Sequence, residues 1–192
     1  MTKKNIILGL TGSIATVMVL KLIDELEKND FNVKIITTKN SWLLLMSVFV
    51  RYPKQIFQFL KIWDSGYSEV VGAFSNKKGK VHHINLVKWA DAILIAPASA
   101  NTISKITHAI ADNFLTTTVL AMPAHKKVFI APAMNEHMWH NVFFQKNIEA
   151  IKKEPLYQII GPETGLLQCG DKGIGKMTEV KDIVRTIKEI IK

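Results

Sequence analysis

The amino-acid sequence predicts an α/β protein with one doubly wound parallel sheet, Rossmann-like or flavodoxin-like, and helices on both faces. Short apolar segments rich in β-branched residues alternate with segments of helical periodicity, the order expected when crossover helices join parallel strands. With 192 residues, of which 48% are hydrophobic, the chain can bury one sizeable core. We therefore expect a single domain over residues 1–192.

The N-terminal part of the chain predicts a strand, a turn and a helix. Residues 5–10 form a short apolar run that ends at the turn of residues 11–13, and residues 14–28 carry apolar side chains at helical spacing. Residues 32–38 are rich in β-branched side chains, as expected of a strand that is buried on both faces. This order and these lengths predict a β-α-β unit.

The middle of the chain is less regular, and the alternation resumes after it. We expect a helix at 41–51 that ends before Pro53, a second helix at 55–62 and a polar loop at 75–80. The later elements follow the same α/β order. They are a helix at 84–89, a strand at 92–96, helices at 101–111 and 114–122, a strand at 127–131, a helix at 138–153, a strand at 157–160 and an amphipathic helix at 179–191.

Composition narrows the class of protein. The longest apolar block, residues 42–50, is too short to cross a bilayer, and no signal peptide is recognisable, so we expect a cytoplasmic protein without a membrane partner. The net charge of +9 favours anionic partners, but it is scattered, which favours a phosphorylated small molecule over nucleic acid. Cys169 is the only cysteine, which excludes a disulfide framework, and the histidines form no metal-binding pattern.

In doubly wound sheets ligands bind beyond the carboxyl ends of the strands, and the first such place is the turn after residues 5–10. Gly12 permits a tight turn, and Ser13 precedes a helix whose free N–H groups favour an anion such as the phosphate of a mononucleotide. Thr11 and Ile14 stand where a dinucleotide fingerprint requires glycine, and no P-loop lysine follows. The alternative is that Ser13 only caps the helix.

A second segment of this kind is residues 96–102, which follows the strand predicted at 92–96. Its small residues would let a flat ring approach the backbone, and Ser99, Asn101 and Thr102 offer hydrogen bonds. The alternative is that these side chains cap the following helix.

Three further positions are candidates for chemistry. In residues 131–139, Asn135 lies between methionines and could hold a carboxylate beside an apolar ring, or could simply cap a helix. The glycine-rich segment 165–177 carries Cys169, and a thiol on such a loop is well placed to meet a substrate. His83 precedes the strand at 92–96, although a lone histidine is usually structural.

Together these segments resemble, in order as well as in content, the signature motifs of the flavin-dependent cysteine decarboxylase family (HFCD flavoproteins). The resemblance covers roughly residues 5–38 and 83–178. The motifs that carry it are Gly12-Ser13-Ile14-Ala15, His83-Ile-Asn-Leu86-Val-Lys-Trp89-Ala90-Asp91, Pro97-Ala-Ser99-Ala100-Asn101-Thr102 and Pro132-Ala-Met134-Asn135-Glu-His-Met138-Trp139.

The resemblance implies an enzyme that uses flavin mononucleotide (FMN) to decarboxylate a cysteine moiety. In that family the thiol is oxidised to a thioaldehyde, which accepts the electrons released as carbon dioxide leaves and becomes an ene-thiol. By resemblance, His83 would assist proton movement, and Asn135 would bind the substrate carboxylate, with Met138 and Lys176 also contacting the substrate. The residues expected to contact FMN are Gly12, Ser13, Ile14, Thr37, Pro97, Ser99, Ala100, Asn101 and Thr102.

Cys169 separates two branches of this family. One branch reduces the ene-thiol with a cysteine as proton donor, whereas relatives that modify lantibiotic peptides lack that cysteine. The presence of Cys169-Gly170-Asp171 favours conversion of 4′-phospho-N-pantothenoylcysteine to 4′-phosphopantetheine in coenzyme A biosynthesis. A peptidyl-cysteine decarboxylase and a non-catalytic flavin-binding regulatory protein are the alternatives.

Three features set this chain apart from the family pattern, and the first is that Thr16-Val17-Met18 stands where Ala-Tyr-Lys is usual after the phosphate turn. Gln168 stands where alanine is usual, and Lys176 replaces an arginine, which keeps the charge but loses bidentate geometry.

The resemblance also implies a homo-oligomer, either a trimer or a dodecamer built of trimers, with flavin at the subunit contact. Because the sequence ends at Lys192, we expect the ligase that supplies the substrate to be a separate protein.

Overall fold

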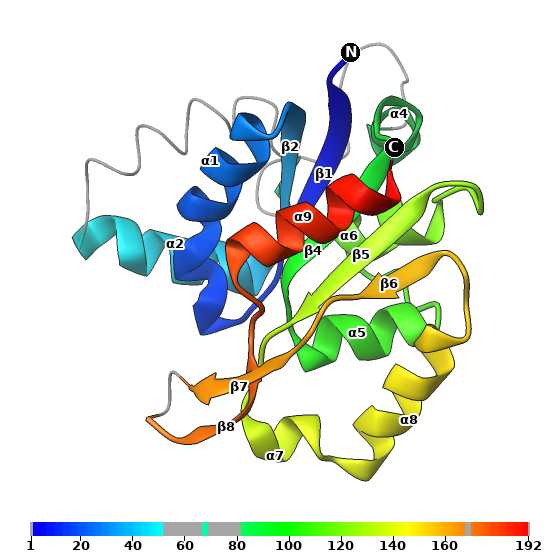
Figure 1. Ribbon diagram of the computed structural model, residues 1–192. Coiled ribbons are helices and arrows are strands. Elements are labelled where there is room, and N and C mark those ends of the chain that lie inside the picture. The colour runs from blue at the N-terminus through cyan, green and yellow to red at the C-terminus, as the bar shows by residue number, and fades with distance from the viewer. Residues whose placement is uncertain (1, 52–66, 69–81, 168–169, 192) are drawn as a thin grey trace.

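The computed structural model (Figure 1) describes residues 2–51, 67–68, 82–167 and 170–191. Within these residues the main sheet has six parallel strands in the order β3-β2-β1-β4-β5-β6. This is the Rossmann order, which reverses between β1 and β4, and it confirms the predicted doubly wound fold. The strands are β1 (Lys4–Leu10), β2 (Phe31–Thr37), β3 (Tyr67–Ser68), β4 (Ala92–Ala98), β5 (Lys127–Pro132) and β6 (Tyr157–Ile159).

Helices cover both faces of the sheet (Figure 1). Successive side chains of β1 alternate between the two resulting cores, with Ile6 and Leu8 in one and Ile7 in the other, so β1 is buried on both faces as expected. On one face lie η1 (Ile14–Met18), α1 (Val19–Lys28), α2 (Lys39–Arg51) and α9 (Val180–Ile190). The other face is covered by α4 (His82–Trp89), α5 (Ala100–Thr107), α6 (Phe114–Leu120), α7 (Glu136–Trp139) and α8 (Val142–Lys152).

Two helices predicted as continuous are divided in the structure. The helix predicted at 14–28 begins as the 3-10 segment η1, in which the Thr16 hydroxyl donates to the carbonyls of Ser13 (2.6 Å) and Thr11 (3.0 Å). The helix predicted at 138–153 is interrupted at Asn141, whose side chain accepts the N–H groups of Phe143 and Phe144 and so starts α8 anew.

Two other predictions need correction. The helix predicted at 101–111 ends as α5 at Thr107, shortly before Ala109 adopts a left-handed φ of 54° that stops the helix. The glycine-rich segment, expected as a loop, contains the antiparallel hairpin β7 (Glu163–Leu166) and β8 (Lys172–Lys176). The elements predicted at 55–62 and 75–80 lie outside the described residues. The other predicted helices and strands are confirmed to within about two residues at each end.

Among the described residues, no helix has both the length and the apolar composition required to cross a bilayer.

Candidate functional site

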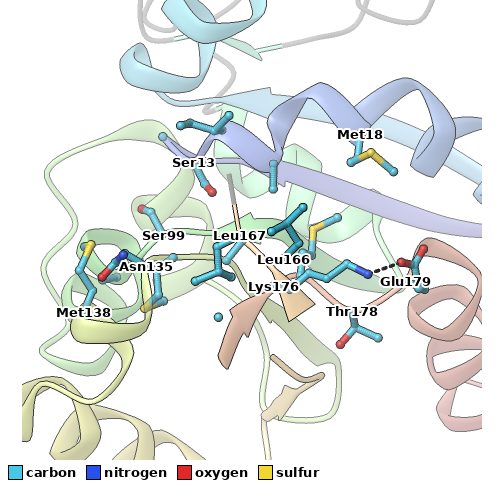
Figure 2. A pocket seen from close by; sticks show the side chains of 18 of the residues that line it. Ser13, Met18, Ser99, Asn135, Met138, Leu166, Leu167, Lys176, Thr178 and Glu179 are labelled. Carbon is cyan, nitrogen blue, oxygen red and sulfur yellow. Dashed lines mark hydrogen bonds and ion pairs between the residues drawn. The ribbon is translucent and has the colours of Figure 1, made fainter. Parts of the chain in front are cut away.

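An open cavity of about 340 Å³ lies beyond the carboxyl ends of β1 and β4, where the strand order reverses (Figure 2). Its volume is in the range of small-molecule and cofactor sites, and its position is where this fold binds ligands. Segments that follow three different strands line it. They contribute Gly12, Ser13, Ile14, Ala15 and Met18 after β1, Ser99 and Ala100 after β4, and Ala133, Met134, Asn135 and Met138 after β5, while Leu166, Leu167 and residues 175–180 complete the wall.

The turn after β1 is shaped by close packing. A Cβ added at Gly12 would lie 2.7 Å from the Cβ of Asn40, so only glycine fits this approach. The Ser13 N–H donates to the Thr11 carbonyl at 2.7 Å, and the Ser13 side chain makes no capping hydrogen bond. Ser13 lines the cavity instead (Figure 2), so the alternative that it is merely a helix cap is wrong.

Thr11, which sequence reasoning missed, joins this turn to the segment after β4. Its fully buried hydroxyl donates to the Pro97 carbonyl at 2.8 Å and accepts the Ser99 N–H at 2.7 Å. The sequence holds no signal for this contact, because the partners lie more than eighty positions away along the chain.

The segment after β4 caps the following helix, and part of it also lines the cavity. Ser99 caps α5, because its hydroxyl accepts the Thr102 N–H at 3.3 Å, and the same residue lines the cavity. Ala100 also lines the cavity. Pro97, Asn101 and Thr102 do not: Thr102 is buried behind the cap and Asn101 is exposed.

Two buried hydroxyl groups have no hydrogen-bond partner within the part of the chain that the structure describes. They belong to Thr37, at the end of β2, and to Thr178. Thr178 lines the cavity, whereas Thr37 does not. Both hydroxyl oxygens are covered by protein, and the Thr178 oxygen lies against Gly161, so neither is exposed to the cavity. The small side chains of Ala100 and Ala133 leave room in the cavity wall for a flat cofactor such as a flavin.

Asn135 acts as the cap of α7 and also lines the cavity. Its Oδ1 accepts the His137 N–H at 2.8 Å, which confirms the capping alternative, and binding of a carboxylate by this side chain stays a prediction. Met138 is half exposed and lies beside it (Figure 2). The arrangement places a fixed amide next to an apolar surface.

Lys176, at the end of β8, brings a positive charge to the cavity. Its Nζ lies 2.6 Å from Oε1 of Glu179 (Figure 2). This hydrogen bond raises the pKa of the Lys176 ammonium and lowers the pKa of the Glu179 carboxyl. Lys176 therefore stays cationic at neutral pH and could meet an anionic ligand.

The structure does not bring His83 to the cavity. His83 lies in the first turn of α4, where its ring meets the Phe114 ring edge to face with centroids 6.5 Å apart. Cys169 lies outside the described residues. The predicted residues that do come together at the cavity are Gly12, Ser13, Ile14, Ser99, Ala100, Asn135, Met138 and Lys176.

Comparison with known proteins gives matches over nearly the whole chain. The flavoprotein family model matches residues 1–192. The chain is 38% identical to a putative phosphopantothenoylcysteine decarboxylase of Dictyostelium discoideum, covering 95% of this chain and 90% of that protein. It is 36% identical to a probable phosphopantothenoylcysteine decarboxylase of Streptococcus mutans, covering 98% and 99% of the two chains.

Solved structures agree with this fold. A cysteine-to-serine variant of PPC decarboxylase in complex with pantothenoylaminoethenethiol has a TM-score of 0.79 and 28% identity over 98% of both chains. The FMN-binding protein AtHal3 has a TM-score of 0.76 and 29% identity over 98% of this chain and 96% of that one. The peptidyl-cysteine decarboxylase EpiD has a TM-score of 0.74 and 29% identity over 97% and 99%.

Proposed function

This chain belongs to the flavoprotein family, and from that premise we propose that it is an FMN-dependent decarboxylase. Its substrate would be 4′-phospho-N-pantothenoylcysteine and its product 4′-phosphopantetheine, in coenzyme A biosynthesis. The observation that carries the proposal is the cavity at the topological switch point, where Ser13, Ser99 and Asn135 meet from three different strand ends. The similarity to proteins named for this activity over nearly their whole length supports the same reading.

Residues of the first two turns would hold the cofactor. The N–H groups at the start of η1, together with Gly12 and Ser13, suit the FMN phosphate. Ala100 and Ala133 leave room for a flat ring. Bound FMN supplies the electron acceptor that decarboxylation beside a saturated carbon requires.

Asn135 and Lys176 would hold the substrate. The Asn135 amide, fixed by its bond to the His137 N–H, can donate to the carboxylate that is lost. Lys176 can attract an anionic group of the substrate. Cys169, by resemblance, would return a proton to the ene-thiol.

We also propose that the protein forms a homotrimer or a homododecamer built of trimers. It would act in the cytoplasm beside a separate phosphopantothenate-cysteine ligase. The place of His83 supports an oligomer, because this side chain does not line the cavity that Asn135 lines. If His83 assists proton movement at the substrate, the histidine that does so has to come from a second copy of the chain. The flavin would then lie at the contact between subunits.

A peptidyl-cysteine decarboxylase is the second candidate function, and the likeness to EpiD favours it. The two candidates share the oxidative decarboxylation and differ in the substrate and in the final reduction.

Purified protein should be yellow, and it should release carbon dioxide from phosphopantothenoylcysteine with formation of saturated phosphopantetheine, as measured by mass spectrometry. Turnover of cysteine-ending peptides alone would favour the second candidate, and flavin binding without any turnover would favour a non-catalytic regulatory protein.

A further inference from the structure

The hairpin β7–β8 forms one wall of the cavity but is not part of the main sheet. It is a separate two-stranded sheet, and it presents Leu166, Leu167, Gly175 and Lys176 to the cavity. A lone two-stranded hairpin is at best marginally stable in water. This wall therefore depends on its attachments to neighbouring elements, and Figure 1 shows β8 beside α7.

Two hydrogen bonds attach β8 to the turn that carries Asn135. The Met134 N–H donates to the Gly175 carbonyl at 3.0 Å, and the Ile174 N–H donates to Oε1 of Glu136 at 3.3 Å. The two anchoring residues, Met134 and Glu136, flank Asn135 directly in the sequence. Of the two attachments, only the one at Glu136 is made by a side chain, so only it can be removed by substitution without altering the backbone.

Gly173 allows the Glu136 carboxylate to lie directly against the backbone of β8. A Cβ added at Gly173 would lie 2.5 Å from the carboxyl carbon of Glu136, too close for any real contact. The carboxylate therefore lies between its own helix and β8 on a side chain that is 37% exposed, and it accepts the Ile174 N–H. The His140 ring also lies near it, with Nε2 3.9 Å from Oε1 of Glu136 and a side chain that is 62% exposed.

We propose that Glu136 is a positioning residue that fixes the β7–β8 hairpin against the Asn135 turn. By holding β8, Glu136 sets the spacing between Asn135 and Lys176, the two side chains that face a substrate from opposite segments. The identity of the substrate rests on the proposed function. The attachment of β8 to the Asn135 turn does not.

Both sides of the contact can be changed. Glu136→Ala removes the acceptor, and we expect amide exchange at Ile174 to become about tenfold faster and the KM for phosphopantothenoylcysteine to rise about tenfold, with FMN content unchanged. Gly173→Ala should displace the Glu136 carboxylate, and we expect the same changes in Ile174 exchange and in KM. The double variant should be no worse than either single one, because both changes disrupt one contact. Glu136→Gln, which keeps an acceptor, is the matched control and should stay close to wild type.

The exchange measurement separates this inference from the proposed function, because it requires neither FMN nor turnover. Unchanged Ile174 exchange in a folded Glu136→Ala protein would overturn the positioning role, and so would additive effects in the double variant. A wild-type protein without decarboxylase activity would remove the proposed function and leave the exchange result standing. If Glu136→Ala fails to fold, Gly173→Ala carries the test, since it retains the carboxylate.

Discussion

At the residue scale, the Thr11 hydroxyl decides how two parts of the cofactor site sit relative to each other. It donates to the Pro97 carbonyl and accepts the Ser99 N–H in a fully buried place. Thr11→Val keeps the shape but leaves both backbone groups unsatisfied, at a cost of about 1–3 kcal/mol in the free energy of unfolding. We expect FMN to bind about tenfold more weakly, by fluorescence titration, because Ser13 and Ser99 lose their fixed spacing.

Thr11→Ser is the control for that prediction, because it retains the hydroxyl and loses only a methyl group. It should bind FMN almost as tightly as the wild type. In urea unfolding, its free energy of unfolding should fall by less than that of Thr11→Val. Equal FMN affinity in Thr11→Val and the wild type would show that the two turns do not need this link.

The Lys176–Glu179 ion pair makes a pH-dependent prediction at the same scale. The pKa of Glu179 is lowered in the folded protein, so the pair contributes stability above the ordinary glutamate pKa of about 4.3 and loses it as the pH falls through the lowered pKa. Both side chains are more than a third exposed, so the contribution is about 0.5 kcal/mol or less. Glu179→Gln should therefore be slightly less stable than wild type at pH 7 in urea unfolding, and the difference should vanish once the pH falls below the lowered pKa of Glu179.

At the element scale, the end of α4 is held by a partly buried lysine contact. Lys126 Nζ donates to the carbonyls of Val87 (2.7 Å) and Ala90 (2.6 Å), and a cation at a helix C-terminus is favourable. Lys126→Met should lower the free energy of unfolding by about 1–2 kcal/mol and speed amide exchange in α4, the helix that carries His83. Lys127→Met is the matched control, because Lys127 donates to the Pro155 carbonyl instead. Equal exchange in the two variants would contradict the capping role.

The elements also show where sequence patterns are informative. Strands buried on both faces, such as β1 and β4, are continuous apolar runs and were predictable with almost correct ends. The interruption at Asn141 was not, because apolar periodicity continues across it and only the Asn side chain restarts the helix. The hairpin β7–β8 was hidden for a related reason: its glycines are typical of loops, and here they allow the close approach of Glu136 and Met134.

At the scale of the whole molecule, the sequence predicted much of the site because strand ends in this fold converge on one edge of the sheet. That rule brought Ser13, Ser99 and Asn135 together correctly. It could not identify Thr11 or Glu136, whose contacts depend on tertiary neighbours far away in the sequence. The same rule could not predict that His83 lies away from the cavity of its own chain.

The separation of His83 from the cavity makes a prediction about assembly. If each site combines His83 of one copy with Asn135 of another, His83→Asn and Asn135→Asp proteins should each be inactive alone. Co-expressed in equal amounts, the two variants should regain about one quarter of wild-type activity. In a closed ring that assembles at random, one site in four combines the intact His83 of an Asn135→Asp copy with the intact Asn135 of a His83→Asn copy. Activity is measured as phosphopantetheine formed per bound FMN, with each variant co-expressed with itself as the control. If both side chains acted within one copy, no mixed oligomer would contain an intact site, and the co-expressed sample would stay as inactive as the controls.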